Sequence, residues 1–291
     1  MEIGIIAKGY IPRYEFESAC EKMKAHGYSC IDYSSFTNTE TDFFNLPEKD
    51  FEKEVTRQRS IIEGNGLRVN QTHAPWRFPP LDATPEQRAI RIEQMAKAVR
   101  GSAYIGADNF VIHPLMPFGI DEYINAKEVL EINEEFLLKL GEVAKKYGVK
   151  SIDLENLPFP NFPINNPADI LKFVKKLNAE SSSDIFKICI DTGHANYCRQ
   201  NPADAVRLVG KHLGSLHVHD NYGTGDDHNV PYDGTIDWQD FSKALNEVNY
   251  SGVFSFETWV SNDIPIGEER ERLEIKLYND GVKIANGLDM Q

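Results

Sequence analysis

Cysteine, basic residues and long apolar runs are all scarce in this sequence. The four cysteines are scattered over 291 residues without a C-x-x-C pair, which argues against a disulfide framework and favours a reducing compartment. No apolar run approaches the roughly 18 residues of a membrane helix. The first eight residues carry an acid at position two and lack the layout of a signal peptide. We therefore expect a cytoplasmic protein with no membrane partner.

Basic residues are outnumbered, with 31 Lys and Arg against 45 Asp and Glu, for a formal charge of −14. A protein that grips a phosphate backbone needs a basic face, because each neutralised phosphate takes a Lys or Arg. The charge balance therefore argues against nucleic acid as the main partner. A local basic patch or bound metal ions would weaken this argument.

A glycine-rich phosphate loop is also missing after the first strand-like segment, where Gly4 and Gly9 form no G-x-G-x-x-G pattern. Apolar strand-like segments nevertheless alternate with amphipathic segments of helical period, such as 86–105 and 128–147. The expected strands are 2–7, 30–33, 68–72, 109–112, 150–154, 186–190, 215–218 and 253–256. We predict an α/β fold, a (β/α)8 TIM barrel whose single domain spans residues 1–291, a length that such barrels commonly reach.

Side chains that can bind metal end six of these eight strands. They are His73, His113, Glu155, Asp191, His217 and Glu257. Any one of them alone is as well explained by a structural hydrogen bond, but their shared position is where a barrel places its active site. Imidazole and carboxylate together suit Zn²⁺, Mn²⁺, Co²⁺ or Fe²⁺.

The remaining histidines divide by position. His194 and His228 fall in loops beside the predicted strand ends, and His219 points to the same side as His217 by strand alternation, as a supporting or substrate-binding group. His26 and His212 lie near expected helix ends, where we expect roles toward solvent or in capping.

Five motifs resemble the xylose isomerase-like TIM barrels, a superfamily of sugar phosphate isomerases and epimerases, tagatose and psicose 3-epimerases, inositol-catabolism isomerases and dehydratases, and endonuclease IV. The motifs are Thr-His-Ala-Pro-Trp at 72–76, Val-Ile-His-Pro at 111–114, Asp-Leu-Glu-Asn at 153–156, Asp-Thr-Gly-His at 191–194 with His-Val-His-Asp at 217–220, and the segment 226–238. The strand order matches over essentially the whole chain.

The resemblance implies a metal site. In the epimerase branch one divalent ion is held by positions that correspond to Glu155, Asp191, His217 and Glu257, and His194 touches substrate. In endonuclease IV three zinc ions take nine ligands, which correspond to His73, His113, Glu155, Asp191, His194, His217, Asp226, His228 and Glu257. One ion is therefore expected, and up to three if the site is multinuclear.

The function that the resemblance implies is a metal-dependent isomerase or epimerase acting on a small carbohydrate: a sugar, a sugar phosphate or a related keto-sugar. The ion would stabilise an enediolate, while Glu155 and Glu257 transfer the proton. His73, His113, His194, Lys8 and Trp76 are the expected substrate-binding residues, with Arg13 as a further cation for a terminal anion. The loop aromatics expected to form apolar walls are Trp76, Phe78, Phe118, Phe159, Phe162, Tyr222 and Trp259.

Two alternatives remain at this point: a zinc phosphodiesterase like endonuclease IV, and a dehydratase or other lyase. The chain departs from endonuclease IV in its first loop, where residues 6–10 read Ile-Ala-Lys-Gly-Tyr instead of a His-Val-Ser type motif. Family members often form dimers or tetramers, so the resemblance also leaves a homo-oligomer open.

Overall fold

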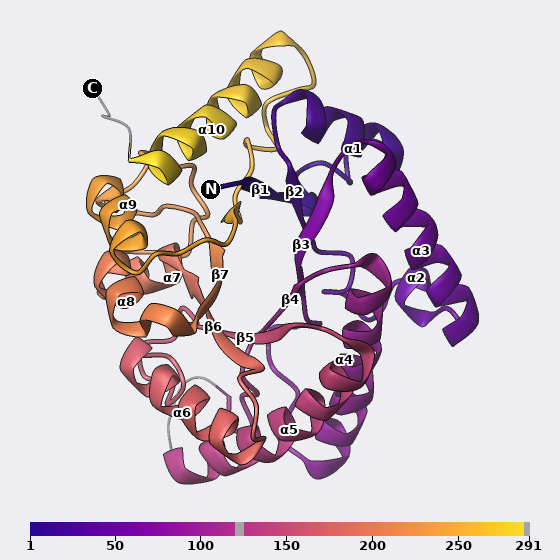
Figure 1. Cartoon of the computed structure of the whole chain (residues 1–291), viewed down its shortest axis with the longest axis vertical. Coiled ribbons are helices and arrows are strands. Elements are labelled where there is room, and N and C mark those ends of the chain that lie inside the picture. Colours follow the sequence, from indigo (N-terminus) through magenta and orange to yellow (C-terminus); the bar gives the residue numbers. More distant parts are fainter. Residues whose placement is uncertain (120–124, 288–291) are drawn as a thin grey trace.

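Eight short parallel strands alternate with helices in the computed structural model, which describes residues 1–119 and 125–287 (Figure 1). The strands are β1 (Ile3–Ile6), β2 (Cys30–Tyr33), β3 (Arg68–His73), β4 (Asn109–Ile112), β5 (Ser151–Glu155), β6 (Phe186–Asp191), β7 (Leu213–His217) and β8 (Phe254–Phe256). The helices are α1 (Phe16–Ala25), α2 (Asp42–Asn45), α3 (Glu48–Gly64), α4 (Pro85–Ile105), α5 (Ala126–Tyr147), α6 (Pro167–Glu180), α7 (Thr192–Tyr197), α8 (Pro202–Val209), α9 (Trp238–Glu247) and α10 (Glu268–Asn286), with short 3-10 turns η1 (Ala7–Gly9) and η2 (Gly210–His212). All eight predicted strands are confirmed to within about two residues at their ends.

The strands close into a barrel. Each strand pairs in parallel with its neighbours in the order β7-β6-β5-β4-β3-β2-β1-β8. The ring is completed by a parallel bridge between Val218 and Phe256, in which the Val218 amide donates to the Ser255 carbonyl at 2.9 Å. The predicted (β/α)8 barrel is therefore confirmed, with the helices arranged around the strands in Figure 1.

Burial explains why the strands read as apolar runs. Every residue of β1 and of β5 is buried, as expected where a parallel sheet is covered on both faces. The covering helices begin and end at residues that satisfy their free backbone groups. Thr84 and Gln87 form a capping box at the start of α4, and Gly106 and Gly148 end α4 and α5 with φ of 82° and 78°.

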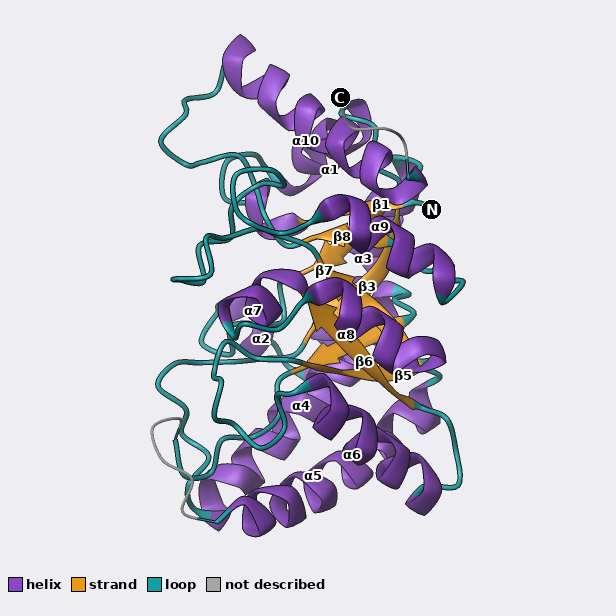
Figure 2. Cartoon of the chain, turned by 90° about the vertical axis from the view of Figure 1, so that its left-hand side faces the viewer, coloured by secondary structure: helices purple, strands orange, loops and turns teal. Residues whose placement is uncertain are grey.

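The long loops gather on one side of the barrel, the left in Figure 2. His73, Glu155, Asp191 and His217 are the last residues of their strands. Since all eight strands run in the same direction, their last residues meet at one rim of the barrel. This geometry brings side chains from distant parts of the sequence together.

The C-terminal helix α10 is attached to the barrel by buried polar groups around His26. The Tyr10 hydroxyl lies 2.8 Å from His26 Nδ1, and the Glu271 carboxylate lies 3.0 Å from its Nε2. Of the two roles predicted for His26, the one toward solvent is wrong, because Tyr10 and α10 cover this ring. The one in capping is confirmed, since His26 is the C-cap residue of α1. His212 ends η2 and is partly exposed.

None of the helices in residues 1–119 and 125–287 combines the length and the apolar character that crossing a membrane requires. The four cysteines are free, and Cys20, Cys30 and Cys189 are buried. Burial raises the pKa of the Cys189 thiol, which lies at the inner end of the site, to about 12. This thiol is therefore neutral in the metal-free protein.

Candidate functional site

Four side chains converge on one point at the end of the barrel where the strands finish. Glu155, Asp191, His217 and Glu257 each offer one ligand atom, and these atoms lie within 4.8 Å of one another. His217 Nδ1 lies 3.0 Å from Glu155 Oε1 and 3.2 Å from Glu257 Oε2. Three carboxylates and one imidazole around one point could hold a divalent ion such as Zn²⁺ or Mn²⁺. We call this set the principal cage.

The orientation of His217 is set by a carboxylate that was not predicted from the sequence. Asp32, in the middle of β2, is fully buried, and its Oδ2 lies 3.2 Å from His217 Nε2. The same oxygen accepts a hydrogen bond from Gln71 Nε2 at 3.1 Å. A proton on Nε2, which faces Asp32 at ion-pair distance, leaves Nδ1 as the lone pair that faces the cage. The signal in the sequence that could have identified Asp32 is an acidic residue inside an otherwise apolar strand segment.

Asp32→Asn is expected to weaken binding of the ion in the principal cage by about tenfold or more, because carboxylates that orient a metal-binding histidine typically contribute 10–100-fold. Competition between the protein and a chromogenic chelator for Zn²⁺ or Mn²⁺ measures this effect. The exposed Asp108 at the opposite end of the barrel provides the matched control, Asp108→Asn. Equal affinities for the two variants would remove Asp32 from the site.

A second cluster shares Glu155 with the principal cage. His73 Nε2 and His113 Nε2 both lie 3.1 Å from Glu155 Oε2, and the three ligand atoms lie within 4.8 Å of one another. His73 Nδ1 is 2.7 Å from the Ala74 carbonyl, which selects the tautomer that presents Nε2 to the cluster. Glu155 therefore has one oxygen toward each cluster.

A third cluster lies beside Asp191 and contains His194, His219, Asp226 and His228. Asp226 Oδ2 is 3.3 Å from His194 Nε2 and 3.6 Å from His228 Nε2. The Nδ1 atoms of these two rings face the carbonyls of Asn156 and Glu257, at 2.8 and 2.7 Å. Both rings therefore direct Nε2 toward Asp226.

His219 completes this third cluster although it was not among the nine expected ligands. Its Nε2 lies 2.9 Å from an Asp191 oxygen, and its ring stacks on that of His228 with centroids 4.0 Å apart. The backbone around it leaves little room, since a Cβ on Gly193 would meet the His219 ring at 1.9 Å. The glycine of the Asp-Thr-Gly-His motif is thus required by the close approach of this ring.

The same motif fixes Asp191 and joins two strand ends. Asp191 caps α7, because its Oδ1 accepts from the His194 amide at 2.6 Å. Thr192 accepts a hydrogen bond from the His219 amide at 3.0 Å and donates one to the His219 carbonyl at 2.6 Å. The ends of β6 and β7 are therefore held in a fixed relation that sets the position of both Asp191 and His219.

The electrostatics of the metal-free site are those of buried ion pairs. Burial opposes the charged form of His217 and His194, but the surrounding anions more than offset this, so the pKa of each imidazole is well above its usual range. The same balance raises the pKa of His228, beside Asp226, to about 9. The pKa values of Glu155 and Glu257 are lowered by His217 despite burial. Protonated histidines thus occupy the position that a cation would take.

Metal binding at pH 7 is expected to release protons, because these imidazoles must lose theirs before they can bind an ion. The release should fall as pH rises through about 9, where His228 loses its proton without metal. In the metal-free protein the ion pair between His228 and Asp226 stabilises the fold fully below pH 6.5, the pKa of the imidazole in the unfolded chain. This stabilisation is lost as pH rises through about 9. Calorimetric titrations in buffers of different ionisation enthalpy count the protons. Metal binding without proton release at pH 7 would contradict this assignment.

Asp220 ends the His-Val-His-Asp motif but serves the loop above it. Its carboxylate is fully buried and accepts from the amides of Asn221, Tyr232 and Thr235 and from Trp238 Nε1, the last at 2.9 Å. Asp220 is therefore not among the side chains that converge on the clusters, and its oxygens hold the 226–238 segment in place. This segment carries Asp226 and His228 to the site.

The predicted substrate-binding residues lie around the clusters. A cavity of about 380 Å³ is lined by His73, His113 and His194 together with Trp76. Lys8 lines a second cavity of about 460 Å³ that also borders His73, and its ammonium lies 5.1 Å from the centre of the Trp259 ring. Their role as substrate ligands stays a prediction.

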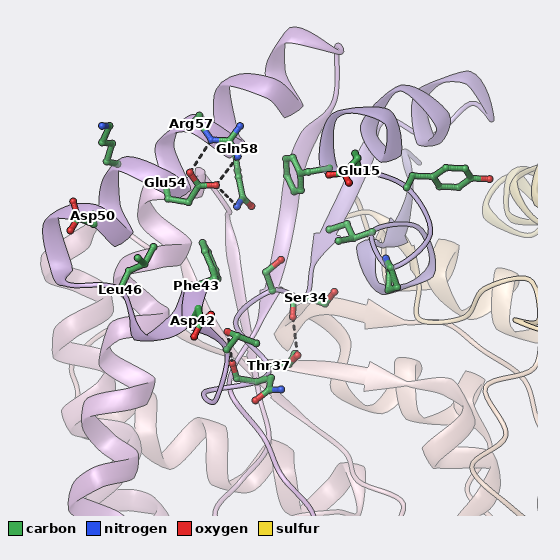
Figure 3. Close-up of a pocket in the computed structure, with 18 of the residues that line it drawn as sticks. Glu15, Ser34, Thr37, Asp42, Phe43, Leu46, Asp50, Glu54, Arg57 and Gln58 are labelled. Atoms are coloured by element: carbon green, nitrogen blue, oxygen red, sulfur yellow. Dashed lines mark hydrogen bonds and ion pairs between the residues drawn. The ribbon is translucent and has the colours of Figure 1, made fainter.

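Arg13 and several aromatics lie elsewhere. Arg13 donates to the Gly9 carbonyl and lines a separate groove of about 1150 Å³ beside α2 and α3, where Glu54 and Arg57 form an ion pair (Figure 3). None of the strand-end ligands lines this groove. Arg13 therefore does not lie beside the site where it was expected to bind a terminal anion. Phe162 is buried in the core instead of forming a cavity wall, whereas Trp76, Phe78 and Phe159 line the 380 Å³ cavity.

Comparisons with known proteins agree with this architecture. The uncharacterised protein MJ1311 of Methanocaldococcus jannaschii is 32% identical over 216 residues, which cover 72% of this chain and 71% of that protein. D-psicose 3-epimerase of Ruminiclostridium cellulolyticum is 25% identical over 245 residues, which cover 81% of this chain and 76% of the enzyme.

The fold has a close structural match in the IOLI protein, whose crystal structure contains a bound zinc atom. The two structures align over the whole of both chains with a TM-score of 0.77 at 17% sequence identity. The family model described as xylose isomerase-like TIM barrel matches residues 20–278. This chain belongs to the xylose isomerase-like TIM barrel family.

Proposed function

We propose that this protein is a divalent-metal-dependent isomerase or epimerase that removes a carbon-bound proton from a small hydroxy-ketone sugar and returns it. The observation that carries the proposal is the pair of carboxylates, Glu155 and Glu257, which both approach His217 Nδ1 within the principal cage. The relationship to a D-psicose 3-epimerase supports a sugar as the substrate class.

The donor set fits a resident ion. Ring nitrogens oriented by Asp32 and by backbone carbonyls bind metal once the imidazoles have lost a proton, and carboxylates of lowered pKa are already in the ionised form that binds metal. Glu155, Asp191, His217 and Glu257 would hold the principal ion. When bound, it would polarise the substrate carbonyl and stabilise the enediolate.

The two glutamates differ in what they can do. Both Glu155 oxygens are engaged by histidines, Oε1 by His217 and Oε2 by His73 and His113. Glu257 is more exposed, with 16% of its side chain accessible against 1% for Glu155, and it borders both cavities. The larger exposure of Glu257 supports a role in accepting a proton from a bound substrate, while Glu155 would serve the ions and return the proton.

Solvent isotope exchange tests the proposal. Metal-loaded protein is incubated in D2O with ketopentoses, ketohexoses, inososes and keto-glycosides, and deuterium on carbon is followed by NMR and mass spectrometry. Exchange at a carbon next to the carbonyl is the expected result, and its absence across the whole panel would overturn the proposal. Product analysis separates an epimerase, which inverts a centre, from a dehydratase, which loses water.

A zinc phosphodiesterase is the second candidate, and the third cluster of His194, His219, Asp226 and His228 favours it. With this cluster the rim could hold three ions, as phosphodiester hydrolysis by a multinuclear site would require. Elemental analysis distinguishes the two candidates. About one ion per chain supports the isomerase, whereas three zinc ions together with cleavage of abasic-site DNA would support the nuclease.

A further inference from the structure

The rim carries two cavities of different chemistry that meet at the principal cage. The 380 Å³ and 460 Å³ cavities both border His73, His228 and Glu257. A molecule that places its reacting carbon beside Glu257 can therefore extend into both. Their separate walls indicate what each end of such a molecule must be.

The 460 Å³ cavity has a polar wall. The side chains that line it and not the 380 Å³ cavity are mostly polar or charged: Lys8, Ser34, Thr37, Asn38, Thr39, Glu40 and Arg91, with Ile6 and Trp259 as the apolar members. The polar and charged groups donate and accept hydrogen bonds, as the hydroxyls of a polyol require. This cavity suits the sugar part of a substrate.

The 380 Å³ cavity has an apolar wall away from the cage, formed by Met116, Leu157 and Phe159, which line this cavity alone, and by Trp76 and Phe78, which line both cavities. We name these five side chains the aromatic wall. They come from three different loops, those after β3, β4 and β5. Phe78 is 61% exposed and Trp76 45% exposed, so large apolar surfaces lie open to solvent directly beside the cage, as at binding sites for apolar groups.

The geometry of the wall defines the shape of its ligand. The rings of Phe78 and Phe159 are nearly parallel, with an interplanar angle of 20° and centroids 6.3 Å apart. This separation is that of an offset aromatic pair and leaves no room for a third ring between them. A flat apolar group would therefore pack on the outside of this pair and not between the two rings.

We propose that the substrate is a sugar derivative that carries a flat, aromatic substituent, with the substituent against the aromatic wall and the polyol in the polar cavity. A free monosaccharide can pack the C–H face of its ring on an aromatic side chain, but it covers less of this wall than an aromatic substituent does. An aryl glycoside or a related aryl-substituted keto-sugar fills both cavities. The reaction at the cage rests on the proposed function, whereas the binding preference does not.

Binding of non-reacting probes tests the proposal. Phenyl β-D-glucopyranoside and methyl β-D-glucopyranoside are titrated into the metal-loaded protein by calorimetry, with Trp76 fluorescence as a second readout. We expect the phenyl compound to bind at least tenfold more tightly. Phe159→Ala, at a side chain that lines only the 380 Å³ cavity, should lower the affinity for the phenyl compound by about fivefold and leave that for the methyl compound unchanged, and Phe78→Ala, at a side chain that lines both cavities, should lower the affinity for the phenyl compound by at least as much. Leu208→Ala, an exposed apolar residue on α8, is the control and should change neither.

Equal affinity for the two probes, or a phenyl preference that survives both Phe variants, would overturn the proposal. A change of oligomeric state in Phe78→Ala would also overturn it, because the wall would then belong to an interface between copies of the chain. The proposed function fails separately: no isotope exchange with any keto-sugar, despite a phenyl preference, removes the reaction and leaves the subsite. Exchange with free ketoses but no phenyl preference supports the proposed function and overturns the aromatic subsite.

Discussion

Glu257→Gln is expected to lower the rate of solvent isotope exchange by about 10²–10⁴-fold, the usual contribution of a general acid or base. Glutamine keeps the size of the side chain and an oxygen that can bind an ion, but it cannot take up a proton from carbon. The contact at 3.2 Å between Glu257 Oε2 and His217 Nδ1 shows how near this carboxylate lies to the principal cage. Exchange followed by NMR in D2O, at saturating metal and substrate, measures the loss.

Metal content separates this chemical role from a structural one. Glu257→Gln should retain most of its ion at saturating metal, whereas Glu155→Gln should lose both ion and activity, because Glu155 is shared between two clusters. Glu63→Gln, at an exposed glutamate paired with Arg59 on α3, should behave as wild type. Near-normal exchange by Glu257→Gln would rule out Glu257 as the proton-transfer group.

The strand ends of this chain could be predicted from sequence because two local signals coincide there. A buried parallel strand reads as an apolar run, and a polar residue that ends the run lies at the rim. Glu155, Asp191 and His217 follow this rule directly, and the structure brings all three to one point. Position along a strand is thus enough to find residues whose side chains meet.

Asp32, Asp220 and His219 could not be assigned in the same way. Asp32 lies within a strand, and its partner His217 is far away in sequence, so the contact at 3.2 Å follows only from barrel closure. Asp220 looks like a ligand by type, but its oxygens are used by the amides of a loop that sequence alone does not place. The difference between a metal ligand and a loop anchor depends on tertiary hydrogen bonds, which a local pattern does not encode.

Loop side chains were predicted least well for the same reason. Trp76 and Phe162 both follow strands and are both aromatic, yet one borders a cavity and the other is buried in the core. Arg13 follows β1 closely but turns back to the Gly9 carbonyl. The direction of a loop side chain is set by packing against other loops, so composition identifies the candidates without selecting among them.

Arg270→Met is expected to destabilise the protein by about 3–5 kcal/mol, as removal of one partner of a buried ion pair generally does. The Arg270 side chain is fully buried, and its Nε donates to Glu274 at 2.8 Å. Its other nitrogens donate to the carbonyls of Val260, Ser261 and Ile264 at 2.7–3.0 Å. Methionine fills much of the volume but leaves the Glu274 carboxylate and three carbonyls without this donor. Thermal unfolding of the metal-free protein should show a Tm lower by roughly 10 °C.

The matched control lies two residues further along α10, where Arg272 is exposed. Arg272→Met makes the same chemical change outside the buried network and should alter stability by less than about 0.5 kcal/mol. Because Arg270 holds the loop that carries Trp259, whose ring lies 6.0 Å from that of His228, Arg270→Met should also weaken metal binding, while Arg272→Met should not. Equal Tm values for the two variants would show that the buried guanidinium contributes no net stability.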